Sequence, residues 1–123
     1  MDFLTDRKKA EGRGASHTGT EHHWYMQVTA VALALIVPTF LYIFGSALGL
    51  GHEAVVATFS RPIPAILTGL VLVGGLLHFN KGAQMVIEDY VHGSTKKVVL
   101  ILLTGFTYAL MATGLFALAK IAL

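Results

Sequence analysis

The sequence predicts an all-α membrane protein with three transmembrane helices. Of its 123 residues, 54% are hydrophobic and only 13% are charged, whereas a soluble domain carries about 25% charged residues. Three long stretches contain no Asp, Glu, Lys or Arg, namely residues 24–51, 62–80 and 98–119. Each can supply the roughly 20 residues that a helix needs to cross a bilayer core. Helices are expected because lipid offers backbone groups no hydrogen-bond partners.

We expect two regions. Residues 1–21 are polar and form a flexible N-terminal tail, and residues 22–123 form a three-helix membrane domain with spans at about 25–48, 63–87 and 98–121. The tail lacks the apolar segment and cleavage site of a signal peptide. The chain contains no cysteine, which excludes disulfides and thiolate chemistry.

The basic residues predict the orientation of the spans. The tail holds Arg7, Lys8, Lys9 and Arg13, and the connection after the second span holds Lys96 and Lys97. The connection after the first span holds only Arg61. Because Lys and Arg are enriched in cytoplasmic loops, we expect the N-terminus and the second connection to face the cytoplasm.

Each span carries its own signals. Trp24 is an interfacial aromatic residue at the start of the first span, and Pro38 should bend that helix. Pro62 suits the first turn of the second span. The third span repeats small residues every four positions, at Gly105, Ala109, Thr113 and Ala117. That spacing is typical of a helix-packing face.

The second span also has a surface of small residues, which include Ala65, Gly69, Gly74 and Gly75. A bulky neighbour can lie against such a surface. A partner helix is one interpretation, and a flat cofactor is the other.

The end of the second span gathers ionisable groups. His78 lies within the apolar run, where an ionisable side chain generally marks function. It either binds a metal such as haem iron or forms a hydrogen bond to a neighbouring helix. Asp89 lies eleven residues further on, which places it within about 20° of the same helix face and roughly 16 Å along the axis. Tyr90 follows directly.

Asp89 and Tyr90 have two interpretations. Both residue types are common at the ends of transmembrane helices. Alternatively, they bind a quinone, whose carbonyl oxygens need one or two donors beside an apolar slot. A tyrosine hydroxyl is a neutral donor that lipid tolerates, and an adjacent carboxylate can orient it or relay a proton.

The segment IEDYVHG, residues 87–93, together with His78 ahead of it, resembles the signature of the small membrane-anchor subunit of succinate dehydrogenase, in its alphaproteobacterial and mitochondrial form. The segment GTEHHW, residues 19–24, followed by Thr29 and Ala30, resembles the start of that family's first helix. The resemblance covers the chain from about residue 19 to its end.

The resemblance implies a bacterial inner-membrane protein that works in a complex. Its partners would be a second, similar three-helix membrane-anchor subunit, an iron–sulfur subunit and a flavoprotein subunit. Electrons from succinate would pass through FAD and iron–sulfur clusters in the partner subunits to ubiquinone. By motif match, His78 would be an axial ligand of haem b, Tyr90 would donate to the quinone carbonyl, and Asp89 would support it.

One position departs from the family pattern. An arginine often precedes the Thr-Ala pair near the haem propionates, and Gln27 stands roughly there in this sequence. Gln27 can form a hydrogen bond to a propionate but cannot neutralise it. His22 and His23 are further candidates for these contacts.

Two alternatives remain open. One is the anchor of a fumarate reductase-type complex that uses another quinone. The other is a non-enzymatic subunit for transport or assembly, although a coupled transporter usually keeps an acid in mid-membrane, and the second span has none before Glu88. We expect no nucleic-acid partner.

Overall fold

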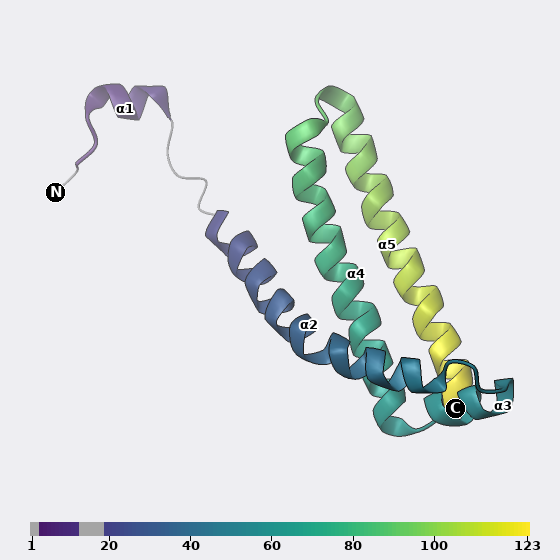
Figure 1. Cartoon of the computed structure of the whole chain (residues 1–123). Coiled ribbons are helices and arrows are strands. Elements are labelled where there is room, and N and C mark those ends of the chain that lie inside the picture. Colours follow the sequence, from purple (N-terminus) through teal and green to yellow (C-terminus); the bar gives the residue numbers. More distant parts are fainter. Residues whose placement is uncertain (1–2, 13–18) are drawn as a thin grey trace.

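The computed structural model describes residues 3–12 and 19–123, and every regular element in these residues is a helix. Figure 1 shows them in chain order: α1 (Asp6–Glu11), α2 (Gly19–Ala47), α3 (His52–Phe59), α4 (Pro62–Tyr90) and α5 (Gly93–Ala122). Three segments are long and apolar enough to cross a membrane, namely Thr20–Ala47, Pro62–Tyr90 and Gly93–Ala122. The prediction of an all-α protein with three transmembrane helices is confirmed.

Two helices lie outside the expected spans. Within the segment expected to be a polar tail, α1 forms one short helix, and the hydroxyl of Thr5 caps it by accepting from the backbone of Lys8. In the first connection, α3 forms a helix that was not predicted from the sequence. Residues 1–2 and 13–18, which include Arg13, lie outside the described residues.

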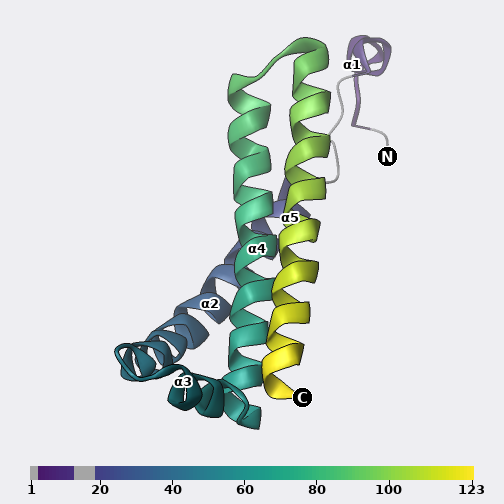
Figure 2. The same cartoon turned by 90° about the vertical axis from the view of Figure 1, so that its right-hand side faces the viewer.

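Helix α4 is the centre of the bundle. It packs against both α2 and α5, and Figures 1 and 2 agree that α4 and α5 run side by side while α2 crosses α4 at an angle. The turn between α4 and α5 lies at one end of the bundle, and α3 lies near the C-terminus at the other. Helix α2 contains Pro38 and changes direction part-way along, as expected.

The packing face of α5 differs from the predicted one. Gly105 would meet nothing in this chain if it carried a Cβ, and the other three residues of its stripe are exposed. Instead, Thr107 is buried to 1% exposure. A Cβ on Gly114 would lie 2.6 Å from a methyl carbon of Leu72 on α4. The close helix contact is therefore at Gly114, and the predicted stripe faces away from this chain.

The small residues of α4 meet helices of the same chain. A Cβ on Gly69 would contact Leu118 of α5 at 3.5 Å, and one on Gly74 would contact Leu33 of α2 at 3.6 Å. At these two positions the small residues of α4 therefore pack against a helix, as the first interpretation of the sequence held, and not against a flat cofactor.

The chain covers little of its own apolar surface. In the most apolar 18-residue stretch of the first, second and third span, 0%, 0% and 6% of the residues are buried within this chain. Lipid tails are as apolar as leucine, so such surfaces are suited to lipid or to helices of other subunits.

Candidate functional site

His78 lies where α2 crosses α4. Four residues before it, Gly74 faces Leu33, and four residues after it, Gly82 faces Met26, whose methyl would lie 3.7 Å from an added Cβ. Residues four apart lie on one helix face. The two glycines therefore let α2 approach α4 closely on both sides of the histidine.

A hydrogen bond joins the two helices at this crossing. Oγ1 of Thr29 on α2 lies 2.7 Å from Nδ1 of His78. The same oxygen lies 2.8 Å from the backbone carbonyl oxygen of Tyr25 and 3.2 Å from that of Met26. His78 is thus bonded to a neighbouring helix, as one interpretation of the sequence held. The bond occupies only one of the two ring nitrogens.

The second ring nitrogen of His78 is open. In the described part of the chain, Nε2 of His22 is the only enclosed side-chain nitrogen or oxygen without a hydrogen-bond partner. Nε2 of His78 has no partner among these residues either, and it is not fully enclosed. The hydrogen bond to Thr29 and an external ligand on Nε2 are compatible.

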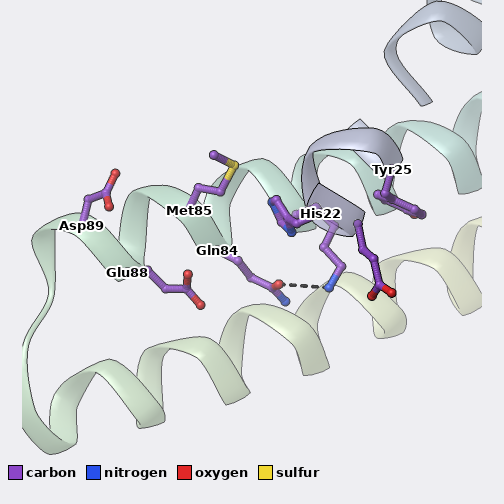
Figure 3. A pocket seen from close by; sticks show the side chains of 8 residues that line it. His22, Tyr25, Gln84, Met85, Glu88 and Asp89 are labelled. Carbon is purple, nitrogen blue, oxygen red and sulfur yellow. Dashed lines mark hydrogen bonds between the residues drawn. The ribbon is translucent and has the colours of Figure 1, made fainter. Parts of the chain in front are cut away.

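A polar hollow lies between His78 and the end of the bundle that carries the α4–α5 turn. It has a volume of about 740 Å³ and is formed by the first turns of α2 and the last turns of α4 (Figure 3). Its lining residues are mostly polar: Glu21, His22, Tyr25, Lys81, Gln84, Met85, Glu88 and Asp89. His22, whose enclosed Nε2 has no hydrogen-bond partner among the described residues, is one of these lining residues.

A chain of polar side chains on α4 connects the hollow to the interior. Nζ of Lys81 donates to Oε1 of Gln84 at 3.2 Å, and Nε2 of Gln84 donates to Oδ1 of Asn80 at 2.8 Å. Asn80 is only 5% exposed. Asn80 and Gln84 were not predicted as site residues from the sequence, although their spacing of four residues on a helix is a signal for such a bond.

The structure brings only some of the predicted site residues together. Asp89 and His22 line the same hollow, whereas Tyr90 is 80% exposed and is not part of its lining. Gln27 lines a separate, apolar depression on α2 beside Trp24. His23 is exposed.

A family model described as the succinate dehydrogenase/fumarate reductase transmembrane subunit matches residues 2–118. The chain belongs to this family. The matched range includes His78 at the helix crossing and the end of α4 with Asp89 and Tyr90.

Relatives in this family agree with the assignment. The succinate dehydrogenase hydrophobic membrane anchor subunit of Paracoccus denitrificans is 43% identical over 123 residues, which are 100% of this chain and 95% of the relative. The subunit of the same name from Rickettsia bellii is 30% identical over 102 residues, or 82% of this chain and 81% of the relative. No solved structure matches the chain.

The family resemblance inferred from the sequence is confirmed. The chain is a membrane-anchor subunit of the succinate dehydrogenase type, a non-catalytic part of the enzyme complex. The described residues contain no cluster of three or more His, Cys, Asp or Glu side chains able to hold a metal ion among themselves. A haem needs no such cluster, because one imidazole on each side of the iron is sufficient.

Proposed function

We propose that this chain anchors a flavoprotein subunit and an iron–sulfur subunit to the bacterial inner membrane, together with a second membrane-anchor subunit, and helps to pass electrons from succinate to ubiquinone. The full-length match to a succinate dehydrogenase anchor subunit carries this proposal. It also favours succinate oxidation over the fumarate reductase alternative, because the relatives are named as succinate dehydrogenase subunits. FAD and the iron–sulfur clusters would reside in the soluble partners.

The surroundings of His78 fit an axial ligand of haem b. An axial histidine offers one nitrogen to the iron and usually donates its other N–H to an oxygen. Nδ1 of His78 has an oxygen partner in Thr29, and Nε2 is left for the iron. The haem, when bound, would supply a one-electron carrier. His78 would hold it from this chain, together with a histidine of the second anchor subunit.

The propionates of that haem need polar contacts, and His22 suits this role better than the other candidates. Its side chain lines the polar hollow and its enclosed Nε2 has no partner among the described residues, so a carboxylate that reached this nitrogen would satisfy it. Gln27 and His23 are exposed in this chain, and they would contact propionates only if the second anchor subunit brings the haem to them.

Asp89 and Tyr90 would form this chain's share of the ubiquinone site. The Tyr90 side chain is exposed at the end of α4, so its hydroxyl is free to donate to a quinone carbonyl that lies between subunits. Asp89 lines the polar hollow and can take up protons from water for the reduced quinone. The two side chains would thus serve binding and proton supply separately.

The haem assignment is tested by absorption spectra of the purified complex, oxidised and dithionite-reduced. We expect His78→Ala to lose the α band of haem b. His92→Ala is the matched control, since His92 lies at the start of α5, away from the helix crossing, and should retain the band. Full haem occupancy in His78→Ala would show that another residue is the ligand.

A further inference from the structure

We propose that Thr29 is a positioning residue for His78. Its hydroxyl oxygen accepts a hydrogen bond from Nδ1–H and so keeps the imidazole in the tautomer whose Nε2 lone pair is free for a metal. This inference rests on the proposed role of His78 as a haem ligand. It concerns a residue of α2 that lies 49 positions away from the histidine.

The direction of the bond follows from counting protons. A threonine hydroxyl has one hydrogen to donate and two lone pairs that accept. Its oxygen is 2.8 Å from the carbonyl oxygen of Tyr25, which can only accept, and 2.7 Å from Nδ1 of His78, which can do either. If the hydroxyl donated to Nδ1, the short contact with Tyr25 would hold two oxygens and no proton.

The other arrangement places a proton in both contacts. The hydroxyl donates to the carbonyl four residues back, which is the usual bond of a threonine inside a helix. The same oxygen then accepts from Nδ1–H of His78. A neutral histidine with its proton on Nδ1 has its lone pair on Nε2, the nitrogen that has no partner among the described residues.

The helix packing holds this pair in place. Gly74 and Gly82 let Leu33 and Met26 of α2 contact α4 one turn to each side of His78. Thr29 lies between Met26 and Leu33 on α2 and is itself half-buried. Inside a membrane there is little water to compete for the bond. The backbone of α2 thereby fixes the ring orientation through the hydroxyl.

The expected consequence is electronic as well as geometric. A hydrogen bond from the N–H of the non-ligating ring nitrogen to an acceptor raises the basicity of the ligating nitrogen. Loss of such a partner typically weakens metal binding roughly 10–100-fold. A more basic ligand stabilises the oxidised iron. Removal of the Thr29 hydroxyl should therefore raise the haem midpoint potential and speed haem loss.

The test compares Thr29→Val, which is isosteric but lacks the hydroxyl, with Thr29→Ser, which keeps it. In the purified complex, a redox titration of the haem α band should give a higher midpoint potential for Thr29→Val. Haem transfer to an excess of an apo-haem acceptor should be about 10-fold faster or more. Thr29→Ser should match the wild type in both measurements. Thr39→Val is the matched control, because the Thr39 hydroxyl donates to the backbone carbonyl of Leu35 on its own helix.

Two results would overturn the inference. One is a Thr29→Val complex with the wild-type potential and haem transfer rate while His78→Ala loses its haem, because then His78 is the ligand and Thr29 does not position it. If Thr29→Val fails to assemble, Thr29→Ala takes its place in the comparison. The second overturning result is then the same midpoint potential and haem transfer rate for Thr29→Ser and Thr29→Ala. If His78→Ala keeps its haem, the assignment of His78 as the ligand is itself wrong. Failure of the ligand assignment can thus be told apart from failure of the positioning role of Thr29.

Discussion

The hydroxyl oxygen of Thr29 on α2 lies 2.7 Å from Nδ1 of His78 on α4. Hydrogen bonds between transmembrane helices contribute about 0.6 kcal/mol on average and up to roughly 1.7 kcal/mol. We therefore expect Thr29→Val to lower the stability of the complex only slightly, as measured by thermal inactivation in detergent beside the control Thr39→Val. Failure of the complex to accumulate would mean that the bond contributes far more to assembly than such bonds normally do.

Substitutions at the end of α4 should separate quinone reduction from succinate oxidation. Tyr90→Phe removes only the hydroxyl and keeps the aromatic ring of a side chain that is 80% exposed in this chain, so the packing contacts needed for assembly should be retained. We expect ubiquinone reduction by succinate to fall by roughly 10-fold or more, in line with the loss of one positioned donor. Succinate oxidation with an artificial dye should be unchanged, and an equal fall in both rates would contradict the assignment.

Asp89→Asn tests the proposed division between proton supply and binding. The substitution keeps the size of a residue that lines the polar hollow and removes its charge. Because Asn cannot carry a proton, we expect the maximal rate of quinone reduction to fall while the KM for quinone stays close to the wild type. The reverse pattern, a raised KM with an unchanged maximal rate, would indicate that Asp89 binds the quinone directly.

Gly114→Ala should disturb the packing of α5 on α4. The added methyl would lie 2.6 Å from one carbon of Leu72 and 3.2 Å from another, so the leucine must shift. Because only the end of a flexible side chain has to move, the cost should lie near the low end of the roughly 1–3 kcal/mol that overpacking costs. Gly105→Ala on the same helix meets nothing in this chain and serves as the control. The melting temperature of the complex should fall for Gly114→Ala, and a fall of the same size for Gly105→Ala would point to a different packing face.

The chain contains no cysteine, so single cysteines can report its orientation. Ser94 lies beside the α4–α5 turn and Ser60 beside the start of α4, and both are exposed. If the N-terminus and the α4–α5 turn face the cytoplasm, a membrane-impermeant maleimide should label Ser60→Cys in intact cells from the periplasmic side and Ser94→Cys only in inverted vesicles. The opposite labelling pattern would reverse the proposed topology.

The features of the candidate site that could be predicted are those whose signals are local. The charge-free runs define the three spans, and the period of the helix places His78 and Asp89 on one face. The segment from Ile87 to Gly93 carries the family resemblance. None of these inferences depends on how one helix meets another.

The sequence could not predict which surfaces meet. In water, an apolar stripe marks the face that a helix buries, but in lipid an apolar side chain is equally suited to lipid and to a neighbouring helix. The stripe of small residues that contains Gly105 has the spacing of a packing face, but in the structure it is Gly114 that contacts the neighbouring helix α4. Asp89 and Tyr90 are adjacent in sequence, yet only Asp89 lines the polar hollow.

Sequence alone is sufficient to establish a three-helix membrane anchor with a histidine inside its second span. The pairing of that histidine with Thr29, which leaves Nε2 open, emerges only from the packed helices. Helical periodicity sets each residue's angle on its own helix, whereas the rotation and crossing of two helices depend on how both surfaces interlock.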